Sequence, residues 1–246
     1  MALIHSFETS GNTLFRFRGQ IPVVLFVLAA PVLYFTDYSL LSRDFILVLT
    51  IVAIIISFAG FLVRAYAIGT TPKGTSGRNR NEQVAESLNV SGIYSIVRHP
   101  LYLGNYLMWI GIVIFTFNIY FIVLVSLAFW LYYERIMFAE ERYLEKKFGD
   151  EFLDWSQNVP AFIPAFGKFK KTKIPFSFKS ILRREYSGIL ATAVGFAFID
   201  LLRIYFITNE FVWNRISIYA VAVSALLAII LRMLKHSNML NEEGRS

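Results

Sequence analysis

The sequence LYLGNYLMWIGIVIFTF occupies residues 101–117, and YFIVLVSLAFWLYYERIMF occupies residues 120–138. Each run is long and apolar enough for a helix to cross the hydrocarbon core of a membrane, which takes about 17–25 residues. A tight turn at Asn118 is all that joins the two runs, so two crossing helices here must be antiparallel. The stretch therefore predicts a transmembrane hairpin whose outer ends return to the same side of the membrane.

Four more apolar runs extend this pattern along the chain. They are Ile21–Thr36, which is short and contains two prolines, then Phe45–Val63, Ile189–Ile207 and Ile216–Leu234. We predict an all-α, polytopic membrane helical bundle of about six transmembrane helices, with a cytoplasmic helix and cytoplasmic loops. The length suits one membrane domain over residues 1–246, with spans one and two in 21–63, a core in 64–164, and a basic loop with spans five and six in 165–246.

The composition also favours a bilayer as the solvent. Hydrophobic residues make up 56% of the chain and charged residues 17%, whereas soluble domains are roughly half apolar and about a quarter charged. Cysteine is absent, which excludes disulfides, thiolate nucleophiles and cysteine metal sites, and three scattered histidines do not predict a metal cluster. In so apolar a chain, the net charge of +7 indicates loops near anionic lipid rather than nucleic-acid binding.

The basic residues predict the orientation of the bundle. If both termini are cytoplasmic, all but three of the 24 Lys and Arg residues belong to the cytoplasmic side, the exceptions being Arg43, Arg203 and Arg215. Such an excess marks cytoplasmic loops. We expect a bacterial inner-membrane protein whose functional loops face the cytoplasm. Within span five, Asp200 and Arg203 are spaced to pair, as a structural pair or a contact in a homo-oligomer.

Two cytoplasmic stretches, Arg64–Arg98 and Ala139–Gly188, are longer than connectors need to be. The first should contain a short helix at Glu82–Leu88. The second contains the basic tract Lys168–Lys173, which suits either a contact with anionic headgroups or a solvated segment.

The end of the first long loop has features of an anion site. In GIYSIVRHPLYLG, residues 92–104, Pro100 suits the first turn of a helix, which places His99 at its cap and Arg98 just outside. A helix N-terminus carries free N–H groups and a partial positive charge. Tyr102 and Tyr106 follow on one face, and Gly104 and Gly111 allow close approach of a backbone or a ligand. The alternative is an ordinary span start with a snorkelling arginine.

The second long loop begins with an acidic helix. Met137, Glu141, Leu144 and Phe148 form one stripe, so Glu141 lies on an apolar face where an unpaired carboxylate is costly. A surface helix with salt bridges is the alternative, but the Glu-to-Lys pairs that would support it are missing after Glu140 and Glu141. Because the hairpin brings this helix to the same mouth as Arg98 and His99, the two poles together suit a zwitterionic ligand.

The patterns Gly92-x-Tyr94-x-x-x-Arg98-His99-Pro100-x-Tyr102-x-Gly104 and Glu140-Glu141-x-x-Leu144-x-x-x-Phe148-Gly149-x-Glu151-Phe152, followed by Val159-Pro160, resemble the signature of the isoprenylcysteine carboxyl methyltransferase family. Phospholipid N-methyltransferases share its architecture. The resemblance covers roughly Arg64–Pro164 and makes this the methyltransferase-like core. It implies S-adenosylmethionine as the cofactor. The residues that it implicates in cofactor binding are Tyr94, Arg98, His99, Tyr102, Gly104, Glu140 and Glu141.

The resemblance implies transfer of a methyl group from S-adenosylmethionine to a carboxylate or amine of a lipid or amphiphilic acceptor. We expect Tyr106 near the acceptor, Glu141 as a proton acceptor if the acceptor is an amine, and Arg64 to position a carboxylate. Arg64 also suits an interfacial anchor. Related sterol reductases use NADPH and carry a similar Arg-His-Pro element, but Leu101 and Glu140-Glu141 stand where they have Asn and Arg-Asp. A non-catalytic membrane protein is the third alternative.

Overall fold

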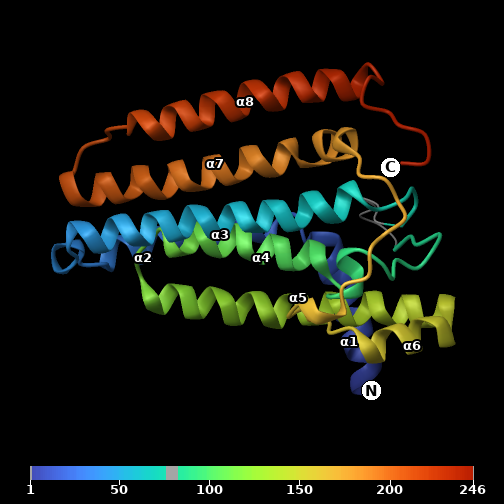
Figure 1. The fold of residues 1–246 in the computed structure, drawn as a ribbon. Helices are drawn as coiled ribbons and strands as arrows, with labels where there is room; N and C mark the ends of the chain where they lie inside the picture. The colour runs from blue at the N-terminus through green and yellow to red at the C-terminus, as the bar shows by residue number, and fades with distance from the viewer. Residues whose placement is uncertain (1, 76–82, 246) are drawn as a thin grey trace.

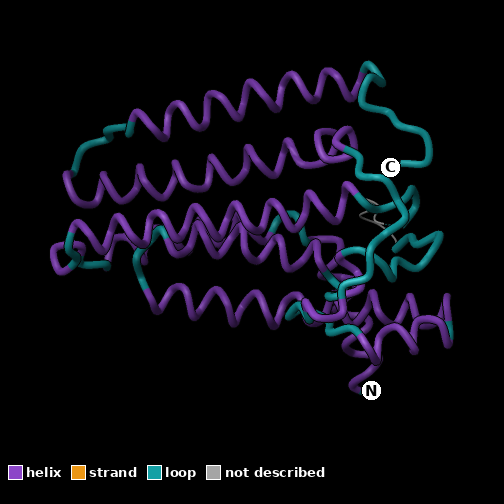
Figure 2. The backbone as a smooth tube through the Cα atoms, in the orientation of Figure 1, coloured by secondary structure: helices purple, strands orange, loops and turns teal. Residues whose placement is uncertain are grey.

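The computed structural model describes residues 2–75 and 83–245, and these form a helical bundle without a strand (Figures 1 and 2). The all-α prediction is confirmed. The α-helices are α1 (Leu3–Phe17), α2 (Ile21–Phe35), α3 (Arg43–Gly69), α4 (Pro100–Ile114), α5 (Ile119–Phe148), α6 (Asp150–Asn158), α7 (Phe178–Thr208) and α8 (Arg215–His236). Three short 3-10 helices, η1 (Tyr38–Leu40), η2 (Ile93–Ser95) and η3 (Phe166–Lys168), lie in the connections.

The long helices run side by side, and both termini lie at one end of the bundle (Figure 1). That end also carries the loop between α3 and α4, helix α6 and the connection to α7, and we call it the loop end. The predicted hairpin is confirmed, because α4 ends at Ile114 and α5 begins at Ile119. Its turn is capped by Asn118, whose side-chain oxygen accepts from the Phe121 N–H at 3.0 Å.

Helices α3, α5, α7 and α8 are long and apolar enough to cross a membrane. Their outer faces expose large apolar side chains such as Ile55, Leu127 and Val223, as lipid-facing surfaces do. The other two predicted spans, α2 and α4, are 15 residues each, and such a helix rises only about 22 Å. The protein is an integral membrane protein, and its described residues contain four full-length candidate spans and two shorter apolar helices.

Helix α7 is longer than its predicted span and begins at Phe178 rather than Ile189. The Ser177 hydroxyl accepts from the Ser180 N–H at 3.1 Å and caps this earlier start. The extension adds polar residues at the loop end, among them Glu185. Farther along α7, the predicted pair is present, with Arg203 Nη2 2.6 Å from Asp200 Oδ1.

Small residues bring α3 and α4 into close contact. A Cβ on Gly104 would lie 2.8 Å from the Gly60 carbonyl oxygen, and one on Gly111 would lie 3.0 Å from the Ser57 nitrogen. Small residues allow this approach between membrane helices, where packing drives association. The close approach expected at Gly104 and Gly111 is therefore made by α3, through the side chains of Arg64 and Ser57 as well as its backbone.

Two segments differ from the predictions. The helix expected at Glu82–Leu88 begins outside the described residues, and residues 83–88 form bends and irregular backbone, with the Glu86 N–H bonded to the Gly74 carbonyl at 2.9 Å. Helix α1 was not predicted, because it is too short and polar to read as a span. Its apolar face packs on α5, where the rings of Phe7 and Phe138 meet edge to face at 5.7 Å.

Candidate functional site

The turn that leads into α4 is fixed by the chain that follows α6. The Arg98 N–H donates to the Pro160 carbonyl at 2.9 Å, and the His99 N–H donates to the Ala161 carbonyl at 3.1 Å. Proline at 160 retains its carbonyl acceptor while lacking an N–H. This pairing places Val159-Pro160 against the Arg-His-Pro element, although the two are far apart along the chain.

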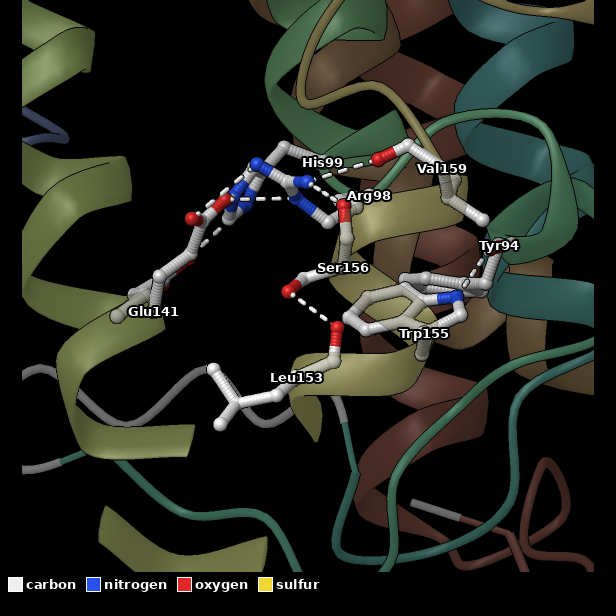
Figure 3. Close-up of polar contacts among 9 residues, drawn as sticks. Tyr94, Arg98, His99, Glu141, Leu153, Trp155, Ser156 and Val159 are labelled. Atoms are coloured by element: carbon white, nitrogen blue, oxygen red, sulfur yellow. Dashed lines mark hydrogen bonds and ion pairs between the residues drawn. The ribbon is translucent and has the colours of Figure 1, made fainter. Parts of the chain in front are cut away.

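The Arg98 guanidinium is held by hydrogen-bond acceptors, namely the Glu141 carboxylate and two backbone carbonyls (Figure 3). Its Nε lies 2.9 Å from Glu141 Oε1 and its Nη2 lies 3.2 Å from Glu141 Oε2. Its Nη1 donates to the carbonyls of Ser156 and Val159. Four of the five guanidinium N–H groups are therefore engaged within the protein. This geometry differs from the expectation that Arg98 waits for an anionic ligand.

His99 stands between two carboxylates at the N-terminus of α4. Its Nε2 lies 2.8 Å from Glu141 Oε1, and its Nδ1 lies 3.5 Å from Glu140 Oε2. The Tyr102 hydroxyl donates to the other oxygen of Glu140 at 2.5 Å. Burial alone would lower the pKa of His99, but the hydrogen bonds and charges of Glu140 and Glu141 outweigh it and raise that pKa above its ordinary value. The ring is thus favoured as an imidazolium.

A cavity of about 480 Å³ opens beside this cluster at the loop end, a volume within the range of small-molecule sites. It is lined by residues of α1, α3, α4, α5, α6 and α7 and of the loop before α4. Six of the predicted residues line it, namely Arg64, Tyr94, Arg98, His99, Tyr102 and Glu140.

The other three predicted residues lie outside the cavity lining. Glu141 faces Arg98 and His99. Gly104 packs against α3. The Tyr106 hydroxyl lies 2.9 Å from Ser126 Oγ on α5, and the Tyr106 ring packs on Phe129. The structure therefore separates residues that line the cavity from residues that support its walls.

Arg64 has partners that the sequence did not predict. Its guanidinium forms a two-point contact with Glu185 of α7, at 2.8 and 2.7 Å, and donates to Asn105 Oδ1 of α4 at 2.6 Å. Glu185 is only 1% exposed. A signal was present, because Glu185 lies at i+4 from Ile181 and i−4 from Ile189, on an apolar stripe. The stripe was hidden because this segment was assigned to a loop.

Tyr94 belongs to η2 and forms part of the cavity wall. Its carbonyl accepts from the Trp155 indole N–H at 3.0 Å, which ties η2 to α6 (Figure 3). Burial raises the pKa of Tyr94 to about 12, only partly offset by a hydrogen bond with Thr71. The phenol is therefore neutral at physiological pH and serves as a polar but uncharged contact.

The cavity changes character along its length. At the N-terminus of α4 it is lined by His99 and Glu140, whereas farther along α4 and α7 it is lined by Met108, Trp109 and Ala191. A ligand with a polar head and an apolar body matches this gradient.

The fold and site define a membrane protein whose helical bundle has, at one end, a cavity with a charged part and an apolar part. Residues 44–151 match the phospholipid methyltransferase family model. A protein-S-isoprenylcysteine O-methyltransferase of Schizosaccharomyces pombe is 30% identical over 114 residues, covering 44% of this chain and 48% of that protein. The corresponding Xenopus laevis enzyme is 29% identical over 117 residues, covering 47% and 41%. A nickel-cobalt-cadmium resistance protein of Alcaligenes xylosoxydans xylosoxydans is 35% identical over 95 residues, covering 39% and 42%.

Residues 44–151 thus match the phospholipid methyltransferase family model and are similar to protein-S-isoprenylcysteine O-methyltransferases, which confirms the resemblance predicted from the two motifs. The chain spans less than half the length of each of these three relatives. No solved structure matches it significantly. The matched segment ends at the start of α6, so α7 and Glu185 lie outside it.

Proposed function

We propose that the protein is an integral membrane methyltransferase that moves a methyl group from S-adenosylmethionine to a carboxylate or amine of a lipid or amphiphilic acceptor. The observation that carries this proposal is the cluster of Arg98, His99, Glu140 and Glu141, which lies beside a cavity and within the segment that matches the family. The names of the relatives give the reaction class.

The cavity residues at the N-terminus of α4 and on the facing part of α5 suit a zwitterionic cofactor. The raised pKa of His99 and the N-terminus of α4 favour a carboxylate. Glu140 lines the cavity with its side chain 25% exposed, so it remains accessible to an amino group or to ribose hydroxyls. S-adenosylmethionine would supply an electrophilic methyl group, and the protein would orient it and exclude water. Phe15 of α1 packs with Tyr102 and Tyr133 and shields this region.

The supporting residues take revised roles in this proposal. Glu141 is a positioning residue that holds His99 and Arg98 from outside the cavity lining. Arg98 lines the cavity but is also a positioning residue, because its N–H groups hold Glu141 and the chain at the end of α6. Glu140 replaces Glu141 as the candidate proton acceptor for an amine acceptor, since it is the carboxylate of the pair that lines the cavity. Tyr106 supports the wall through α5. Arg64 keeps its proposed role beside the acceptor.

The acceptor's apolar part would occupy the end of the cavity near Met108 and Trp109. The loop end would face the cytoplasm, where S-adenosylmethionine is available and where basic loops are favoured. A bacterial inner membrane is the setting that we propose.

Calorimetric titration of the detergent-purified protein with S-adenosylmethionine tests the cofactor. We expect saturable binding by the wild-type protein and its loss in His99→Ala. Glu151→Gln, a change at an exposed position of α6, should bind normally. A thermal shift with NADPH and none with S-adenosylmethionine would instead establish the reductase alternative.

Transfer of tritium from methyl-labelled S-adenosylmethionine identifies the acceptor class. The probes are phosphatidylethanolamine vesicles, which offer an amine, and N-acetyl-S-farnesylcysteine, which offers a carboxylate. Base-labile label in the farnesylcysteine probe indicates a methyl ester, and base-stable label in the vesicle lipid indicates an N-methyl group. Binding of S-adenosylmethionine without label in either probe would contradict the proposed acceptor classes.

A further inference from the structure

Helix α7 lies outside the segment that matches the family, yet it places a buried carboxylate in the wall of the cavity. Glu185 is 1% exposed, and both of its oxygens contact Arg64 of α3. Asn105 of α4 binds the same guanidinium. Three helices therefore meet at one polar contact, which we call the Arg64–Glu185–Asn105 junction.

The position of this junction along the cavity is informative. His99 and Tyr102 begin α4, Asn105 follows about one turn later, and Met108 and Trp109 line the cavity about one further turn along. On α7, Glu185 likewise precedes Ala191 and Thr192. The junction thus lies between the charged cluster proposed for the cofactor and the apolar end proposed for the acceptor tail.

The charges at the junction are already balanced. Four of the five Arg64 N–H groups have partners among the described residues, two of them on Glu185. The guanidinium is held in one orientation, and its charge is compensated without any ligand. A buried pair of this kind adds little stability over apolar side chains of similar size, so stability alone is a weak reason for its presence in a cavity wall.

We propose that Glu185 is a positioning residue that holds Arg64 against the polar head of the acceptor, so that α7 determines acceptor recognition. This inference rests on the proposed function. It adds that residues beyond the family segment complete the acceptor side of the site. The cofactor side, formed by His99 and Glu140, should be independent of Glu185.

The test separates acceptor recognition from cofactor binding and from folding. Glu185→Gln removes one charge of the pair, and the double variant Arg64→Met/Glu185→Met replaces both partners by apolar side chains and keeps the protein foldable. The matched control is Asp200→Leu/Arg203→Met, which removes the other buried pair of α7, remote from the cavity. Each variant is measured for its thermal unfolding temperature, its Kd for S-adenosylmethionine, and its methyl transfer to the probe that the wild-type protein labels.

We expect Glu185→Gln, which keeps Arg64 but weakens its hold, to retain its Kd for S-adenosylmethionine while kcat/KM for the probe falls about 100-fold, as for a misplaced group. The Arg64→Met/Glu185→Met variant should lose at least as much kcat/KM while it retains its unfolding temperature and its Kd for S-adenosylmethionine. The control pair should leave kcat/KM unchanged. Wild-type kcat/KM in the double variant would overturn the inference, because the pair would then be only structural. A parallel loss of S-adenosylmethionine affinity would also overturn it, by placing the junction on the cofactor side. A wild-type protein that binds no S-adenosylmethionine would overturn the proposed function, and that result is obtained before any variant is measured.

Gly188→Ala provides a second measurement that leaves both charges of the ion pair in place. The added Cβ would lie 3.6 Å from Glu185 Oε2 and 3.8 Å from Met108 Cε, which are ordinary contacts, so the protein accommodates it. Gly188 lines the cavity, and the methyl group should raise the KM for the probe with an unchanged Kd for S-adenosylmethionine. The control is Gly167→Ala, where nothing lies within 4 Å. An unchanged KM would contradict an acceptor at this wall.

Discussion

Neighbouring residues of the site have different roles, as the cluster of Arg98, His99, Glu140 and Glu141 illustrates. Adjacent residues on a helix point about 100° apart, so Glu140 and Glu141 meet different neighbours. Glu140 lines the cavity, whereas Glu141 turns to Arg98 and His99. The sequence predicted that both motifs meet at one mouth, and the structure brings them together there. The sequence did not predict which glutamate faces the cavity, because that depends on how the turn before α4 packs against α5.

The protonation of His99 makes a prediction about pH. Its partners raise its pKa in the folded protein above the unfolded value near 6.5. The stabilisation that the charged ring provides is therefore complete below that unfolded value and is lost as the pH rises through the folded pKa. We expect the unfolding temperature in detergent, and the affinity for S-adenosylmethionine, to decline as the pH rises through that range. His99→Gln should flatten both profiles, and a wild-type profile parallel to that of His99→Gln would contradict this role.

Glu141→Gln should destabilise the protein more than a surface change does. The substitution removes the charge partner of Arg98 and of His99 while both remain largely buried, with Arg98 15% exposed. Breaking one side of a buried pair costs about 3 kcal/mol, which a lower denaturation midpoint would reveal. Glu151→Gln, at an exposed site, should change stability by less than about 0.5 kcal/mol. Equal midpoints for the two variants would show that Glu141 is not a support of the site.

At the scale of elements, periodicity and turn chemistry predicted the α4–α5 hairpin, since Asn118 between two apolar runs leaves no room for another arrangement. They did not predict α1 or the start of α7, because both are polar segments that become helical through tertiary contacts. Helix α1 gains its place from packing on α5, where Tyr132 donates to the Leu14 carbonyl at 2.6 Å. The polar start of α7 is stabilised by Arg64, a residue of α3, and no local pattern reports such a partner.

Gly104→Ala tests the close contact between α3 and α4. The added Cβ would meet the Gly60 carbonyl at 2.8 Å, and backbone cannot move aside as a flexible side chain does. Overpacking of this kind costs about 1–3 kcal/mol, so we expect a lower unfolding temperature. Gly167→Ala serves as the control, because its Cβ would meet nothing within 4 Å. A stable Gly104→Ala protein that had lost S-adenosylmethionine binding would instead support the cofactor contact that the family motif implies for Gly104.

At the scale of the whole molecule, the distribution of basic residues and the structure both distinguish the same two ends of the bundle. Both termini and the connection from α6 to α7, which includes the basic tract Lys168–Lys173, lie at the loop end, whereas the connection from α7 to α8, which includes Glu210, lies at the opposite end (Figure 1). The residues that begin α4 and line the cavity also belong to the loop end. Composition and the distribution of Lys and Arg predicted this polarity. Which residues of α7 reach the cavity required the packed bundle, because helix phase and tilt are set by contacts between neighbours.

The absence of cysteine from the natural chain allows a direct test of orientation. Lys171→Cys and Glu210→Cys each introduce a single thiol at an exposed position, one at the loop end and one at the far end. If the loop end faces the cytoplasm, a membrane-impermeant maleimide should label Cys at 210 in intact spheroplasts and should reach 171 only after the membrane is opened. Positive loops resist translocation, which is the physical reason for this expectation. Labelling of 171 in sealed spheroplasts would place the cavity outside the cell, away from its proposed cofactor, and would remove the basis of the methyltransferase proposal.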